Sequence, residues 1–113
     1  MAGEGPEYRE FNFSPSGEWA VYDFQSYRNA RMQERALENE LSPVIEVHRT
    51  IDRLELAAEI CQDLLPHGRA LRLGLSAVVE DVSGKLSYWA LRHPPGKPDF
   101  HHPEAFVLQL EKT

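Results

Sequence analysis

The sequence predicts a small all-β protein of antiparallel strands, arranged as a sandwich or an open barrel. Short runs of alternating apolar and polar residues are separated by clusters of Gly, Pro, Ser and Asp. No helical periodicity is sustained over a long stretch, and 113 residues suit one small domain. Many short runs joined by tight turns are typical of antiparallel pairing.

The clearest hairpin lies near the N-terminus. Strands at Phe11–Phe13 and Trp19–Phe24 flank Ser14–Gly17, a turn whose proline presets its own φ and whose glycine permits a positive one. Residues 1–7 are small and acidic, and we expect them to be disordered. Residues 25–41 are polar and fit a helix only loosely, which predicts a long loop.

The segment 52–65 fits two structures. Its apolar residues recur at helical spacing, and Asp52 with Glu55 could form a capping box. Residues 54, 56, 58 and 60 also alternate as in a strand. The spacing slightly favours a helix, whereas the preceding strand, Val44–Arg49, and the short connection after it favour a hairpin partner.

The C-terminal half contains the strands that should form the core. Leu71–Glu80 alternates most clearly, and Gly74 within it predicts a bulge or a close backbone approach. A strand at Leu86–Leu91 and a stiff loop with four prolines, residues 93–104, lead to a last strand at Phe106–Leu110. The residues expected to be buried on one face are Leu71, Leu73, Leu75, Ala77, Val79, Phe106, Leu108 and Leu110.

The composition and charge of the chain limit the kinds of partner and the cellular compartment that we expect. The net charge of −6 argues against a nucleic-acid partner, because phosphate backbones attract basic surfaces. No apolar run is long enough to span a membrane, and the N-terminus has no signal-peptide pattern. The single cysteine, Cys61, excludes an internal disulfide, so we expect a cytoplasmic protein.

Three stretches carry a resemblance to a known family: FNFSPSGEWAVYDFQSYR (residues 11–28), LGLSAVVED (73–81) and SYWALRHPPGKPDFHHPEAFVLQL (87–110). They resemble the DOMON-like domains of bacterial proteins, whose superfamily includes haem-binding and sugar-binding DOMON domains and the ninth family of carbohydrate-binding modules. The resemblance implies an antiparallel β-sandwich over residues 8–113. It also implies a strand rather than a helix at Leu54–Glu59, followed by a helical turn near Gln62–Leu65.

The same resemblance predicts an incomplete domain. Family members are longer at the N-terminus, with several strands and a W-E-x-x-C-F-E-F-F-like motif before the segment that starts here at Tyr8. The sequence therefore corresponds to an N-terminally truncated sandwich. We expect the outer edge of the hairpin Tyr8–Phe24 to be unpaired, and exposed edges recruit partners. A symmetric homodimer through that edge is the simplest outcome.

The expected ligand site combines aromatic and polar side chains. Sugar rings stack on exposed aromatic faces, while arginine and carboxylate groups bind their hydroxyls. A tryptophan in a small sandwich is also commonly a core residue, and that alternative stays open. The candidate ligand-binding residues are Tyr27, Arg28, Trp89, His93, Asp99 and His101.

We expect neither a metal nor a resident cofactor. His93, Asp99, His101 and His102 are residue types that bind zinc, but they lack the spacing of a zinc site, and hydrogen bonds that fix the loop are the simpler expectation. Haem follows only from the resemblance. Met32 with His93 or His101 could supply its axial ligands.

No catalytic constellation is recognisable, since the serines lack a nucleophile-elbow context and Cys61 lies in an apolar stretch. The expected function is a non-enzymatic binding or interaction domain for a carbohydrate or another small polar ligand. The alternatives are a structural remnant whose main property is self-association and a haem-binding electron-transfer domain.

Overall fold

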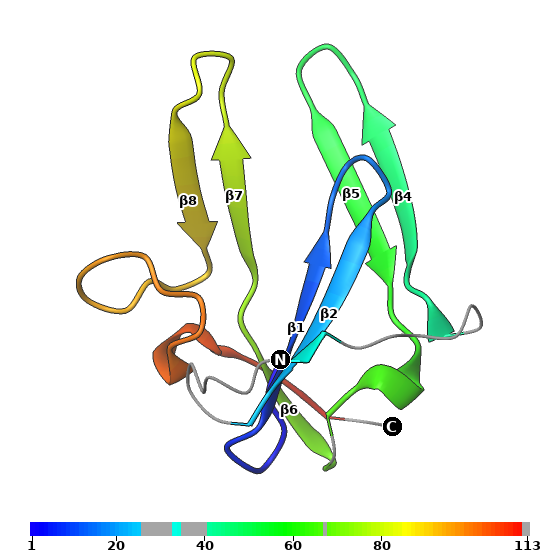
Figure 1. The fold of residues 1–113 in the computed structure, drawn as a ribbon, viewed down its shortest axis with the longest axis vertical. Helices are drawn as coiled ribbons and strands as arrows, with labels where there is room; N and C mark the ends of the chain where they lie inside the picture. Colours follow the sequence, from blue (N-terminus) through cyan, green and yellow to red (C-terminus); the bar gives the residue numbers. More distant parts are fainter. Residues whose placement is uncertain (26–32, 35–40, 67, 112–113) are drawn as a thin grey trace.

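The computed structural model describes residues 1–25, 33–34, 41–66 and 68–111, and these residues form an all-β protein (Figure 1). Two short 3₁₀ turns, η2 (Gln62–Leu64) and η3 (Pro103–Ala105), lie between strands. The strands are β1 (Tyr8–Phe13), β2 (Trp19–Phe24), β3 (Gln33–Glu34), β4 (Val44–Arg49), β5 (Leu54–Glu59), β6 (Ala70–Leu73), β7 (Ser76–Glu80), β8 (Leu86–Ala90) and β9 (Leu108–Glu111).

The body of the molecule joins two groups of strands through the N-terminal segment. Antiparallel β1, β2 and β3 form one group, and antiparallel β6 and β9 form the other. Ala2 bridges them, because it pairs with Tyr8 of β1 and exchanges two 2.8 Å backbone hydrogen bonds with Arg72 of β6. The Met1 amine also donates to the carbonyl of Arg9 at 2.8 Å. Met1 and Ala2, where the sequence predicts disorder, thus lie along the outer edge of β1.

The core of the body is a small aromatic cluster. The β1–β2 register places Tyr8 directly opposite Phe24, and their rings stack 4.7 Å apart at 3°. Ala2 completes the buried cluster, with Tyr22 and Phe106 packed against it.

Arg9 connects the β1–β2 hairpin to the middle of the chain. Arg9 Nε donates to Asp23 Oδ1 at 2.6 Å, and Arg9 Nη1 donates to the carbonyl of Leu64 in η2. Only 17% of the Arg9 side chain is exposed, so these contacts lie in a partly desolvated position. They hold the β1–β2 hairpin against the segment that follows β5.

Two hairpins project from the body as arms (Figure 1). One is β4–β5 and the other is β7–β8, and each forms a two-stranded sheet. Strand β5 confirms the prediction of a strand at Leu54–Glu59, with the 3₁₀ turn η2 after it. The spacing of this segment slightly favours a helix, but the structure has a strand, because all six residues of β5 pair with β4.

The predicted core is wrong for most of its residues. Leu71 is buried and Leu73 and Phe106 are partly buried, but the rest are exposed: Leu75, Ala77, Val79, Leu108 and Leu110. The expected single strand divides at Gly74, where a Cβ would lie 2.8 Å from the carbonyl oxygen of Ala105. This contact confirms the close backbone approach predicted at Gly74. Beyond it, β7 leaves the body and pairs with β8.

Candidate functional site

A chain of polar side chains joins β1 to the loop before η3. His101 Nδ1 lies 3.0 Å from the Tyr8 hydroxyl, and His101 Nε2 lies 3.0 Å from Glu10 Oε2. Asn12 Nδ2 donates to the other Glu10 oxygen at 2.7 Å. Tyr8, Glu10 and Asn12 follow one another at a spacing of two, which places them on one face of the strand. We call Tyr8, Glu10, Asn12 and His101 the His101 cluster.

The ring of His101 is fixed from several sides. Its centroid lies 4.8 Å from that of Phe24 and 5.7 Å from that of Tyr8. The backbone N–H of His101 donates to Asp99 Oδ1 at 3.1 Å. Both ring nitrogens face protein groups, so the imidazole orders the proline-rich loop against the aromatic core.

The carboxylate of Glu10 is stabilised in its charged form. The hydrogen bond from His101 is the largest cause that lowers the pKa of Glu10, and the hydrogen bond from Asn12 acts in the same direction. Partial burial opposes both, because it disfavours the charged form. The lowered pKa of Glu10 means that this carboxylate stays charged to a lower pH than an ordinary glutamate.

The structure brings two of the expected ligand residues together, Asp99 and His101. Trp89 lies on β8 with 63% of its surface exposed, and its Nε1 donates to Ser87 Oγ at 3.0 Å. His93 is exposed, and its ring lies 6.1 Å from that of Phe100, which also contacts Tyr88. Tyr27 and Arg28 lie outside the described residues.

Sequence reasoning missed Tyr8, Glu10 and Phe24 as neighbours of His101. Their partner is about 90 residues away in the chain, so no local spacing reports the contact. One signal was available: the alternation of Tyr8, Glu10 and Asn12 predicts that their side chains share a face.

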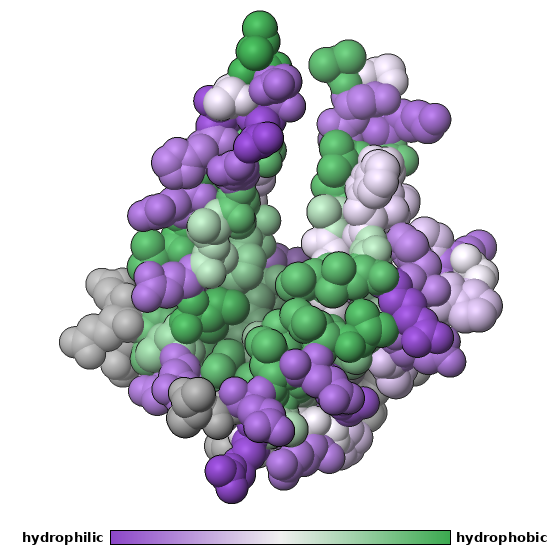
Figure 2. Space-filling view, turned by 180° about the vertical axis from the view of Figure 1, so that it is seen from behind, coloured by the Kyte–Doolittle hydropathy of each residue, from purple (hydrophilic) through white to green (hydrophobic). Residues whose placement is uncertain are grey.

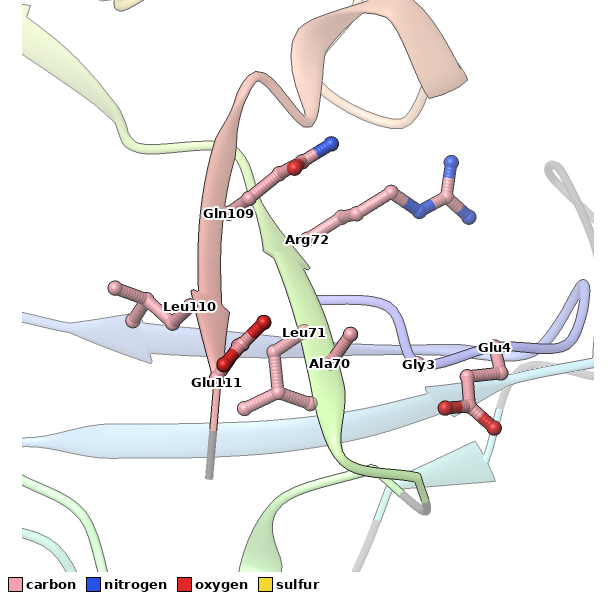
Figure 3. A pocket seen from close by; sticks show the side chains of 8 residues that line it. All are labelled: Gly3, Glu4, Ala70, Leu71, Arg72, Gln109, Leu110 and Glu111. Atoms are coloured by element: carbon pink, nitrogen blue, oxygen red, sulfur yellow. The ribbon is translucent and has the colours of Figure 1, made fainter. Parts of the chain in front are cut away.

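A separate open pocket of about 580 Å³ lies over the β6–β9 pair and the N-terminal segment (Figure 3). Arg72 and Gln109 lie opposite each other in the register, and the acidic side chains of Glu4 and Glu111 also line the pocket. None of the ligand residues expected from the sequence is among the residues that line it. Its mixed charges over a partly apolar floor define no single ligand class.

Within the described ranges, no three His, Cys, Asp or Glu side chains are placed to hold a metal ion. Met32, the suggested haem ligand, lies outside those ranges. No helix in the described part of the chain is long and apolar enough to cross a membrane.

No family model, curated protein or solved structure matches the chain. The function of the site must therefore be inferred from its own geometry. The His101 cluster is closed, since its hydroxyl, imidazole and carboxylate are hydrogen-bonded to one another. The β7–β8 arm, by contrast, presents uncovered apolar side chains.

Proposed function

We propose that the chain is a non-enzymatic interaction module of the DOMON-like type, which associates with another polypeptide through its apolar arms. One observation carries this proposal: the β7–β8 arm exposes large apolar side chains on both of its faces. Trp89 and Val79 lie on one face, and Val78 and Tyr88 lie directly opposite each other on the other face. All four side chains are 43–63% exposed.

The β4–β5 arm provides the internal comparison. Val47 and Leu56 pair on one face, whereas His48 and Glu55 pair on the other. One apolar and one polar face are typical of a hairpin with one side in water. The β7–β8 arm lacks a polar face of this kind, and strands that are apolar on both sides are typical of a buried sheet.

The extent of the apolar surface supports the same proposal. Figure 2 shows hydrophobic residues that continue from the body onto both arms. Monomeric soluble proteins rarely expose large contiguous apolar patches, and those that do commonly use them to bind.

Light scattering after size exclusion tests the proposed function, together with binding of a hydrophobic fluorescent dye. We expect either self-association or, for any monomer, strong dye binding that Trp89→Ser reduces. The control Val82→Ser replaces a fully exposed apolar side chain at the hairpin tip, outside the paired strands, and should leave dye binding unchanged. A monomer that binds no dye would refute the proposal.

Trp89 favours a second function, binding of a carbohydrate or another small polar ligand. Its exposed indole on a regular strand is a suitable platform for a sugar ring. A glycan array and quenching of tryptophan fluorescence test this function. Binding that survives Trp89→Ala would show that the indole is not the platform.

A further inference from the structure

The outer edge of β8 lacks the features that normally protect an edge strand. Between Leu86 and Leu91 the sequence reads LSYWAL, with no charged residue, proline or glycine. Natural edge strands commonly carry lysine, proline or a bulge that prevents pairing with another chain. In the described part of the structure, β8 pairs with β7 alone.

The hydrogen-bond pattern shows which backbone groups this edge presents. Leu91 N donates to the Leu75 carbonyl at 3.1 Å, and Asp81 N donates to the Lys85 carbonyl at 2.9 Å. Antiparallel ladders alternate, so residues 87 and 89 also direct their N–H and C=O groups toward β7. The corresponding groups of Leu86, Tyr88 and Ala90 therefore point away from β7.

We propose that a second copy of the chain pairs with this edge, antiparallel and about a two-fold axis at Tyr88. In that register Tyr88 lies opposite Tyr88 of the second copy, and Leu86 lies opposite Ala90. Three such pairs provide about six backbone hydrogen bonds, because each hydrogen-bonded antiparallel pair exchanges two. The two β7–β8 arms become one four-stranded sheet.

The side chains suit a second copy. No charged residue of β8 faces another across the axis, so the net charge of −6 is not concentrated at the contact. Tyr88 pairs with its own copy, which is a favourable aromatic cross-strand pair. The exposed side chains of Leu86, Tyr88, Trp89 and Leu91 supply roughly 700 Å² over two copies. Interfaces of that size belong to weak, reversible complexes.

The sequence predicts dimerisation through the outer edge of the Tyr8–Phe24 hairpin, but that edge is less available for pairing than β8. Met1 and Ala2 lie along β1, and β3 pairs with β2, so both sides of the Tyr8–Phe24 hairpin have neighbours. The outer edge of β8 has no strand partner in the described structure, although the ring of Phe100 contacts that of Tyr88. The proposed pairing rests on the proposed function, and it specifies both the partner and the strand.

Disulfide trapping tests the register. In a Cys61→Ser background, Tyr88→Cys places two thiols on residues whose Cα atoms are about 5.5 Å apart, within disulfide range. Val78→Cys is the matched control, because Val78 lies opposite Tyr88 on the same face and is 53% exposed. Two copies of residue 78 would be separated by three strand spacings, about 14 Å. We expect a cross-linked dimer from the first variant and little from the second.

A charge at the axis provides an independent measurement. Tyr88→Lys places two like charges opposite each other and should weaken dimerisation at least tenfold in light scattering, with β-sheet circular dichroism retained. Val78→Lys should have a much smaller effect.

The outcomes separate the two proposals. Equal cross-linking at positions 78 and 88, or polymers instead of a dimer, would overturn the β8 register. Association that neither lysine variant changes would also overturn it, while the proposed function would stand. A monomer that binds the hydrophobic dye would likewise overturn the register and leave the proposed function standing. A monomer that binds no dye would refute both.

Discussion

Replacement of His101 by alanine should destabilise the fold more than replacement of any exposed histidine. His101→Ala removes one polar contact of the Tyr8 hydroxyl and one of Glu10, which keeps its hydrogen bond from Asn12. It also removes a ring packed 4.8 Å from Phe24. Tyr8 is 6% exposed, so its hydroxyl would be left in a poorly hydrated position. The perturbation therefore combines lost packing with lost polar partners.

The expected cost can be worked out group by group. The Tyr8 contact should contribute about 1 kcal/mol, and the ring packing about 0.5–1.5 kcal/mol. The contact with Glu10 should add about 1 kcal/mol, since its 32% exposed side chain is partly screened by water. The total is about 3 kcal/mol, which should lower the melting temperature by roughly 12 °C in a domain of this size.

Urea denaturation of a double-mutant cycle is the assay. Tyr8→Phe removes only the hydroxyl, and its coupling energy with His101→Ala should be about 1 kcal/mol. His93→Ala is the control, because that histidine is exposed, and it should cost at most about 0.5 kcal/mol. A His101→Ala variant as stable as His93→Ala would show that the cluster contributes nothing to the fold.

Three other perturbations have expected outcomes. Gly74→Ala should cost about 1–3 kcal/mol in urea denaturation, because its methyl group would meet backbone atoms at 2.8 Å, whereas Gly5→Ala meets nothing within 4 Å and should be nearly neutral. Arg9→Ala should lower the free energy of unfolding by about 2 kcal/mol, since it breaks two partly buried contacts. Arg53→Ala removes an ion pair whose side chains are 70% and 57% exposed and should cost less than about 0.5 kcal/mol, so equal effects would contradict this reasoning. The lowered pKa of Glu10 means that the unfolded chain takes up its proton first as the pH falls, so the stability from this group is complete above its ordinary value of 4.5 and is lost below it. Acid titration of Glu10→Gln should therefore show a shallower loss of stability than the wild type, and parallel curves would refute the assignment.

The strands could be predicted from the sequence because their signal is local. Alternation placed β2 and β4 at the residues where the structure has them. Strand β5 followed from the family resemblance instead, because the spacing of its residues slightly favoured a helix. The division of the predicted strand Leu71–Glu80 could not be predicted in the same way. It depends on the backbone of Ala105, about 30 residues later, and Gly74 indicated a close approach without naming its partner.

Contacts between distant parts of the chain also limit how well the buried residues and the candidate site can be predicted. The spacing of Ala77 and Val79 correctly places them on one face of β7, but alternation does not say whether a second sheet covers that face. In the candidate site, Asp99 and His101 are two residues apart and could be grouped from the sequence. Glu10 could not, because it meets His101 only after the chain has folded.

The contrast between the body and the β7–β8 arm is the basis of the proposed association. In the His101 cluster, hydroxyl, imidazole and carboxylate are joined to one another, which orders a loop. In the β7–β8 arm, β8 pairs with β7 alone among the described strands, and it carries exposed apolar side chains. An arm of this kind gains free energy only when something covers it, since apolar burial contributes about 25 cal/mol per Å². In the proposed pairing, the fold is ordered at its base, and its β8 edge is completed by a second copy of the chain.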